Sequence, residues 1–258
     1  MKKTNLSLTI GWLYPDLMST YGDRGNIICF SKRCEWKGIK TKILKIQQDT
    51  PLYLLKSINF LFGGGAQDKQ QEIVMNDLKG MKKKIIKNLI ENNIPSLFVC
   101  GSPQLMGEYY ETADNKILEG LNIFDIYTKN PSKSEKRFIG NIVAKLEINN
   151  LNRKFIERDF KEIYLVGFEN HGGRTYLREN VKPLARVIKG YGNNGADKTE
   201  GIIYKNAIGT YLHGPFLSKN PEITDYLINA ALYSKYKKII KTKIINNDLE
   251  TLAKKSLI

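Results

Sequence analysis

The sequence predicts an α/β protein with a mostly parallel sheet flanked by helices and a second half that is richer in strands. The first hundred residues alternate short apolar runs, typical of buried strands, with longer helical patterns. Two of the apolar runs end directly in residues suited to a ligand site, Gly63–Gly65 and Cys100. The length of 258 residues and 41% hydrophobic content allow a core to form without disulfides or a structural metal. We therefore expect one domain whose strand ends form a binding edge.

The first half contains four predicted strands and two long helices. The strands are expected at residues 6–13, 40–46, 58–62 and 96–99. The helices are expected from a cap at Asn26 through Trp36, and from about 70 to 91. This order predicts parallel strands joined by helices that cover the sheet.

The second half contains five predicted strands before its helix. They are expected at residues 137–144, 163–168, 185–188, 201–204 and 207–212, followed by a helix over 221–236. No linker divides the chain, so we predict a single domain over 1–258, with a core of about 5–236 and a basic C-terminal tail at 237–258.

The chain carries 41 Lys and Arg against 26 Asp and Glu, a formal charge of +15. These residues are spread over predicted helix surfaces, which favours solvated faces and no nucleic-acid partner. An acidic partner or an anionic membrane surface is an alternative. No stretch approaches the roughly 18 apolar residues of a transmembrane segment, and no secretory signal is evident. We expect a cytoplasmic protein without a transmembrane segment.

The central motif is Val99-Cys100-Gly101-Ser102-Pro103-Gln104, at the end of an apolar strand. A nucleophilic side chain followed by small residues is the arrangement of a nucleophile elbow, with cysteine in the place of serine. A helix N-terminus at this point favours the thiolate, and the backbone N–H of Gly101 is available for an oxyanion. The alternative is a small buried cysteine at a strand end.

A cysteine nucleophile needs a base, and the chain has only two histidines. His171 and His213 both follow predicted strands and stand beside glycines, so both could reach the same sheet edge. Their positions in the sequence do not indicate which of the two is the base.

The glycine cluster and the cysteines indicate which cofactors the chain could bind. Gly63-Gly64-Gly65 allows a close backbone approach to a ligand oxygen, but no Walker-type phosphate loop is present. Cys29, Cys34 and Cys100 show no spacing for a disulfide framework or zinc site. We expect no metal site, and no ATP-driven step on this chain alone.

Together these motifs resemble the class I (triad) glutamine amidotransferases, and more narrowly their cobyric acid synthase-like (CobB/CobQ-like) branch. Within the branch, the chain is most similar to the glutaminase subunits of lipid II isoglutaminyl synthase. The resemblance covers most of the chain and is carried by Tyr14–Leu17, Tyr21–Asn26, Gly63–Asp68, Cys100–Gly107, Arg137–Asn141, Gly167–Thr175 and Gly209–Pro215. It implies a flavodoxin-like three-layer fold.

The resemblance implies catalytic roles for Cys100, which would attack the side-chain amide of glutamine, and for His213 as base and acid. The remaining implied positions are Gly65 and Gly101 for the oxyanion, Gln104 and Arg137 for the substrate, and Asn170, His171 and Arg174 for a substrate or interface loop.

Two places in the chain depart from the patterns of related enzymes. The wider class has an acid two residues after the histidine, where this chain has Pro215. A Cys-His dyad is therefore implied, or an acid from elsewhere, with Asp16 and Asp23 as candidates. The branch usually reads Cys-Gly-Gly-Tyr/Phe-Gln at the elbow, where this chain has Ser102-Pro103, and we expect this difference to reshape the glutamine pocket.

The resemblance also implies a heterodimer with a Mur ligase-like (MurT-like) subunit and no cofactor on this chain. The partner would use ATP and Mg²⁺ to activate D-glutamate of lipid II, a peptidoglycan precursor, for amidation to D-isoglutamine. This places the complex in the cytoplasm, at the inner face of the membrane where the lipid-linked substrate lies. The alternatives are an amidotransferase of the same branch with another acceptor such as a corrinoid, a cysteine hydrolase without ammonia transfer, and a non-catalytic binding subunit.

Overall fold

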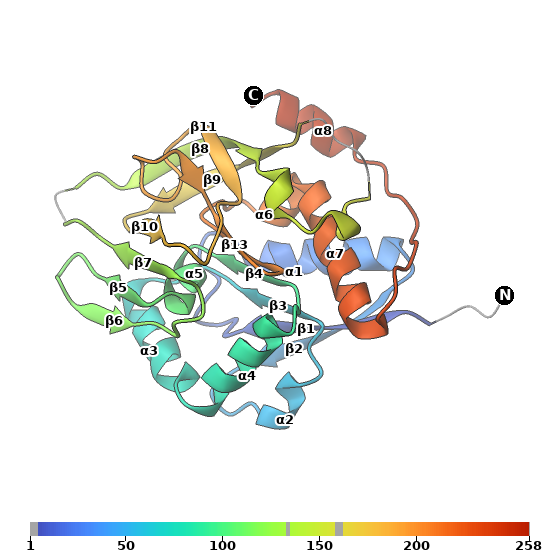
Figure 1. Cartoon of the computed structure of the whole chain (residues 1–258), viewed down its shortest axis with the longest axis horizontal. Coiled ribbons are helices and arrows are strands. Elements are labelled where there is room, and N and C mark those ends of the chain that lie inside the picture. The colour runs from blue at the N-terminus through green and yellow to red at the C-terminus, as the bar shows by residue number, and fades with distance from the viewer. Residues whose placement is uncertain (1–4, 133–134, 158–161, 258) are drawn as a thin grey trace.

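A six-stranded sheet forms the centre of the molecule, with the strand order β13-β14-β4-β3-β1-β2 (Figure 1). The computed structural model describes residues 5–132, 135–157 and 162–257. The strands are β1 (Ser7–Leu13), β2 (Lys40–Ile46), β3 (Phe60–Gly63), β4 (Ser96–Val99), β13 (Ile202–Tyr204) and β14 (Ala207–Thr210). Every neighbouring pair is parallel except β13–β14, which confirms the mostly parallel sheet.

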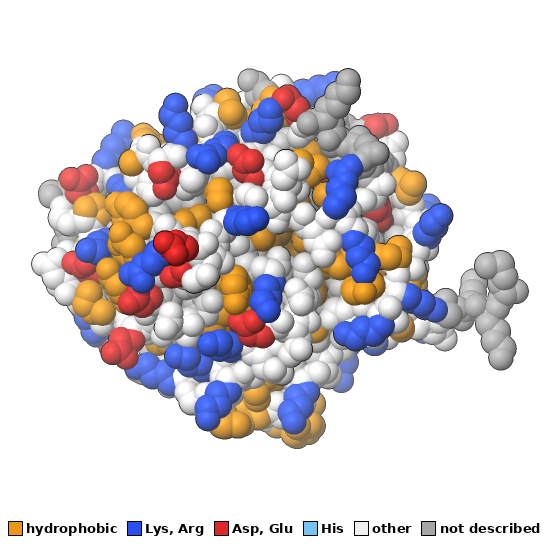
Figure 2. Space-filling model, in the orientation of Figure 1, with side chains coloured by type: hydrophobic (Ala, Val, Ile, Leu, Met, Phe, Trp, Pro, Cys, Tyr) orange, Lys and Arg blue, Asp and Glu red, His pale blue; other side chains and the backbone are white. Residues whose placement is uncertain are grey.

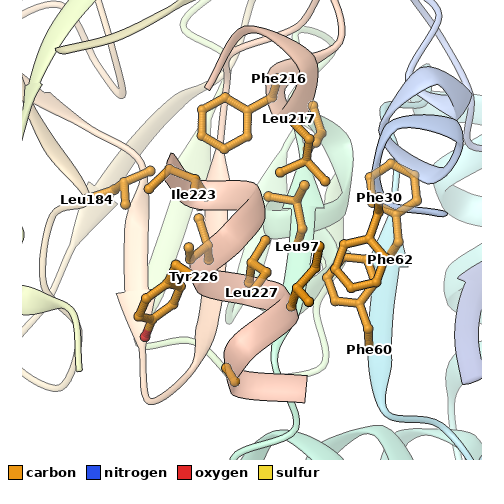
Figure 3. Packing of buried hydrophobic residues seen from close by; sticks show 14 of the residues in the cluster. Phe30, Phe60, Phe62, Leu97, Leu184, Phe216, Leu217, Ile223, Tyr226 and Leu227 are labelled. Carbon is orange, nitrogen blue, oxygen red and sulfur yellow. The ribbon is translucent and has the colours of Figure 1, made fainter. Parts of the chain in front are cut away.

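Helices cover both faces of this sheet. One face carries α1 (Arg24–Trp36), α6 (Phe216–Lys219) and α7 (Pro221–Tyr236), and the other carries α2 (Leu52–Leu55), α3 (Asp68–Leu78) and α4 (Met81–Glu91). Successive strand residues point to opposite faces. Phe60 and Phe62 therefore pack toward α1, where Phe60 stacks on Phe30 at 4.1 Å (Figure 3), while Leu61 joins the core on the other face.

Three details of the first half differ from the sequence prediction. The helix expected over 70–91 is two helices, because Gly80 adopts a φ of 79° between α3 and α4. Helix α1 begins at Arg24, so Asn26 lies inside it and does not cap it. The short helix α2 between β2 and β3 was not predicted. It supplies the crossover that two parallel strands require.

The second half builds two four-stranded sheets beside the central one. The order β12-β11-β8-β9 is antiparallel throughout, and the order β10-β7-β5-β6 is mixed. Their strands are β5 (Tyr109–Glu111), β6 (Ile117–Glu119), β7 (Ile126–Lys129), β8 (Phe138–Leu146), β9 (Tyr164–His171), β10 (Arg174–Leu177), β11 (Ala185–Lys189) and β12 (Thr199–Glu200). Helix α5 (Gly101–Met106) follows β4, and two 3₁₀ turns lie at Ile148–Asn150 and Arg153–Phe155. Strands β8, β9, β11, β13 and β14 were predicted, whereas the shorter β5, β6, β7, β10 and β12 were not.

The segment after α7 runs back along the outside of the domain to α8 (Asp248–Lys255) (Figure 1). The Lys37 ammonium donates to the Lys243 carbonyl at 3.2 Å, and the Arg33 guanidinium donates to Asn247 Oδ1 at 2.8 Å. The boundary between core and tail stays a prediction, and residue 258 lies outside the described residues.

Charged side chains are scattered over the face shown in Figure 2, with Lys and Arg interspersed among acidic and hydrophobic residues. Among the described helices, none combines the length and apolar character needed to cross a membrane.

Candidate active site

Cys100 occupies a strained turn between β4 and α5. Its φ is 55° and its ψ is −102°, and its N–H donates to the Thr210 carbonyl at 2.8 Å. A non-glycine residue held at positive φ is rare and is typical of a nucleophile elbow. Gly101 begins α5, so its N–H belongs to the first turn, which has no acceptor within the helix. The side chain is mostly buried but reaches the wall of a cavity.

Gly65 lies at the meeting point of three side chains. A Cβ on this residue would lie 3.1 Å from Asp23 Oδ2, 3.2 Å from Cys100 Cβ and 3.2 Å from His213 Cε1. The missing side chain thus lets all three groups converge. The expectation that the Gly65 N–H is free for an oxyanion needs correction, because it donates to Asp23 Oδ2 at 2.7 Å.

His213 is oriented by Asp23. Its Nδ1 lies 2.8 Å from Asp23 Oδ1, and both side chains are buried. The other Asp23 oxygen accepts from Gly65, so the carboxylate is held at both ends. Asp16, the other acidic candidate, is exposed and instead accepts from the Gln47 amide at 3.1 Å.

The surroundings of His213 favour the protonated form of its ring. Burial alone lowers its pKa, but the negative charge of nearby Cys100 and the hydrogen bond and charge of Asp23 outweigh burial and raise the pKa to about 10. Nε2, the nitrogen not directed at Asp23, makes no hydrogen bond of standard geometry with the described residues. It is the ring atom available for proton exchange.

The Tyr21–Asn26 segment, which includes the start of α1, packs against the residues that follow His213. Tyr21 meets the His213 ring edge-on at 4.9 Å between centroids. A Cβ on Gly25 would lie 2.2 Å from Pro215 Cγ, so only glycine allows this contact. Asn26 Oδ1 accepts from the Leu217 N–H at 2.8 Å. The motif that supplies Asp23 therefore also fixes the histidine loop.

The unusual elbow residues fit their surroundings. Ser102 is buried, and its hydroxyl donates to the Gly64 carbonyl at 2.6 Å. Pro103 lies in the first turn of α5, where a missing N–H is tolerated. Ser102 thus ties the elbow to the glycine loop through a hydrogen bond that glycine could not make.

A cavity of about 550 Å³ opens over Cys100. Its lining includes Gln104, Arg137, Asn170 and His171 among the residues predicted for the site. Gln104 is held at both ends, since its Oε1 accepts from Gln71 at 3.0 Å and its Nε2 donates to the Tyr211 hydroxyl at 2.9 Å. Arg137 is exposed at this cavity and donates to the side chain and the carbonyl of Asn170 at 3.1–3.2 Å.

The second histidine has a different environment. His171 pairs its Nδ1 with the Gly173 carbonyl at 2.8 Å and stacks on Tyr211 with ring centroids 3.8 Å apart. Burial lowers its pKa, which favours the neutral ring. It lines the cavity but does not contact Asp23.

Arg174 does not belong to the cavity wall. Its guanidinium donates to the Gly172 and Lys136 carbonyls, each at 2.7 Å, and lies over the Phe138 ring. These contacts hold its loop, and the predicted role of Arg174 in a substrate or interface loop stays a prediction.

Sequence reasoning missed several lining residues and supports of the site, namely Tyr21, Gln67, Asp68, Lys69, Gln71, Tyr110 and Tyr211. Some of them lie within the motifs already noted, which was the available signal. Within the described residues, no group of three or more His, Cys, Asp or Glu side chains could hold a metal ion.

Comparison with known proteins shows the family to which the chain belongs. Residues 9–221 match the CobB/CobQ-like glutamine amidotransferase domain. The chain is 41% identical over 252 residues to the GatD subunit of the glutamine-hydrolysing lipid II isoglutaminyl synthase of Staphylococcus aureus, covering 97% of this chain and 95% of that protein. It is 40% identical over 231 residues to the GatD subunit of Streptococcus pneumoniae, covering 89% and 82% of the two chains.

A solved structure supports the fold independently. A glutamine amidotransferase from Thermotoga maritima superposes with a TM-score of 0.51 at 16% identity, covering 97% of this chain and 86% of that one. The α/β fold is thus that of the class I glutamine amidotransferases, as predicted. The family match and the two identities show that the chain belongs to the CobB/CobQ-like glutamine amidotransferase family and is an enzyme of that class, closely related to the GatD subunits.

Proposed function

We propose that this chain is a glutaminase subunit that hydrolyses L-glutamine to glutamate and ammonia for a lipid II isoglutaminyl synthase. The observation that supports it most strongly is the convergence of Cys100, His213 and Asp23 around Gly65, at the wall of a cavity that also contains Gln104. The close similarity to GatD subunits points to the same reaction.

The first half-reaction forms a thioester. The Cys100 thiolate attacks the amide carbon of the glutamine side chain, and the carbonyl oxygen becomes an oxyanion beside the Gly101 N–H. The C–N bond then breaks as His213, protonated at Nε2, gives its proton to the leaving nitrogen. Ammonia and a γ-glutamyl thioester result. The raised pKa of His213 supports this step, because the ring then carries a proton before attack.

The second half-reaction releases glutamate. Neutral His213 takes a proton from water, whose oxygen attacks the thioester carbon. The tetrahedral intermediate expels the thiolate, and the original imidazolium–thiolate pair is restored. Asp23 stays ionised, keeps Nδ1 as the donor and so leaves Nε2 for both proton transfers.

We further propose that ammonia passes to a Mur ligase-like (MurT-like) partner, which binds ATP and Mg²⁺ and amidates D-glutamate to D-isoglutamine in lipid II. The names of the two relatives describe a subunit of such a synthase. Delivery across a protein interface keeps ammonia from protonation in bulk water.

The test uses L-glutamine labelled with ¹⁵N at the side-chain amide. The chain, a Mur ligase-like partner, ATP, Mg²⁺ and lipid II are combined, and the label is followed into lipid II by mass spectrometry. We expect wild type to transfer the label into lipid II and Cys100→Ala to transfer none. Free ammonium should still support amidation in the presence of the variant. Glutamate release without label in lipid II would agree with the glutaminase activity but contradict lipid II as the acceptor of the ammonia.

A further inference from the structure

Helix α8 buries a lysine and exposes two leucines. Lys254 is buried, and its ammonium donates to the Tyr164 carbonyl at 3.1 Å and to Glu222 at 2.7 Å. Leu249 and Leu252, one turn apart, are instead 81% and 68% exposed. An ordered helix that turns two leucines to solvent and a lysine inward is the reverse of the usual arrangement. Its outer side therefore fits an apolar environment.

The exposed apolar surface continues onto α1. Ile28 and Trp36, two helical turns apart, are 57% and 55% exposed and line a groove that Glu250 of α8 also lines. A second groove, lined by Leu249, shares Ser218 and Glu250 with the first. We call these four residues, Ile28, Trp36, Leu249 and Leu252, the α1–α8 apolar surface.

Lysines dominate the segment that frames this surface. Residues 237–257 contain six lysines and two acidic residues, a net charge of +4. The Lys243 carbonyl is bound by Lys37, one residue after Trp36, so this part of the basic segment lies beside the apolar surface. Five of the six lysines are at least partly exposed, and only Lys254 is buried.

We propose that the α1–α8 apolar surface docks onto an anionic lipid bilayer. Exposed Trp, Ile and Leu beside lysines are the composition of helices that lie in the membrane interface. Protein interfaces are depleted in Lys, which disfavours a protein partner. A second copy of the chain would bring two positively charged tails together, which disfavours a dimer. The proposal is independent of the glutaminase activity.

The test is partition of the full-length chain onto vesicles. Vesicles containing phosphatidylglycerol should bind the chain, whereas pure phosphatidylcholine vesicles should not, and added salt should weaken the binding. The chain has two tryptophans, and the emission of Trp36 should shift to the blue on binding. Trp36→Phe should remove that shift.

The discriminating variant is Leu249→Gln/Leu252→Gln. It should lower partition onto phosphatidylglycerol vesicles about 10-fold or more. Tyr53→Gln/Met81→Gln, which changes two exposed apolar residues of α2 and α4, should bind like wild type. Both variants should keep their glutaminase activity, so that a failed membrane test is distinguishable from a failed enzyme assignment.

Three outcomes would overturn the proposal. They are absence of binding to the anionic vesicles, equal binding to both kinds of vesicle, and wild-type partition by the leucine variant. Loss of binding to a Mur ligase-like partner in the leucine variant, with vesicle binding intact, would assign the surface to that protein instead.

Discussion

His213 Nδ1 lies 2.8 Å from Asp23 Oδ1, although 190 residues separate the two in the chain. The position two residues after the histidine, Pro215, packs instead against Gly25. The two segments meet closely, so an acid before α1 reaches the imidazole. We infer that Asp23 takes the orienting role that a residue after the histidine has in the wider class.

Asp23→Asn should lower kcat for glutamine hydrolysis by on the order of 10²- to 10⁴-fold, because the amide cannot keep Nδ1 as a donor and stabilise the imidazolium. The protein should remain folded, since the amide oxygen can still accept from Gly65. The measurement is steady-state glutamate release. Asp16→Asn, the matched control on an exposed carboxylate, should be near wild type. Similar losses of kcat in both variants would contradict an orienting role for Asp23.

The two histidines should respond differently to substitution. His213→Gln should abolish most of kcat, because it removes the group that moves the proton. His171→Gln should act mainly on KM, since His171 lines the cavity and packs on Tyr211. Michaelis–Menten analysis of both variants separates these effects. A larger kcat loss in His171→Gln would make that residue the base.

The His213 ring should be protonated at neutral pH, with a pKa of about 10 against an ordinary value of 6.5. The pKa is raised in the folded state, so its stabilising contribution is complete below pH 6.5 and is lost as pH rises through about 10. With two histidines in the chain, NMR titration can resolve each ring. Cys100→Ala should move the His213 pKa downward, because it removes the thiolate charge. An unchanged titration would exclude the ion pair.

Ser102→Ala should lower the free energy of unfolding by about 1–3 kcal/mol, because the Gly64 carbonyl loses a buried donor. Denaturant unfolding measures this. Ser57→Ala removes a similar bond to the Leu54 carbonyl at an exposed site and should cost less than about 0.5 kcal/mol. Equal effects would show that Ser102 does not tie the elbow to the glycine loop.

The sequence predicted what depends on local pattern. Strands β2 and β4 and helix α7 have the predicted bounds, because apolar runs and Pro221 mark them clearly. Strand β5, with three residues, carries too little periodicity to be recognised. The break at Gly80 was hidden by helical patterns on both sides.

The sequence predicted most residues of the site but not which of them form hydrogen bonds with one another. Cys100 and the two histidines stand at strand ends, which local pattern reveals. The link between Asp23 and His213 depends on contacts between distant loops, and so does the use of the Gly65 N–H by Asp23. Hydrogen bonds between segments so far apart in the chain are not revealed by residue spacing.

The most direct test of the account is glutamate release from L-glutamine by the purified chain, with and without a Mur ligase-like partner. Wild type, Cys29→Ser and Cys34→Ser should release glutamate, and Cys100→Ala should release none while keeping its fold and its partner. Loss of activity in all three cysteine variants, or activity that survives Cys100→Ala, would contradict a cysteine nucleophile at the end of β4.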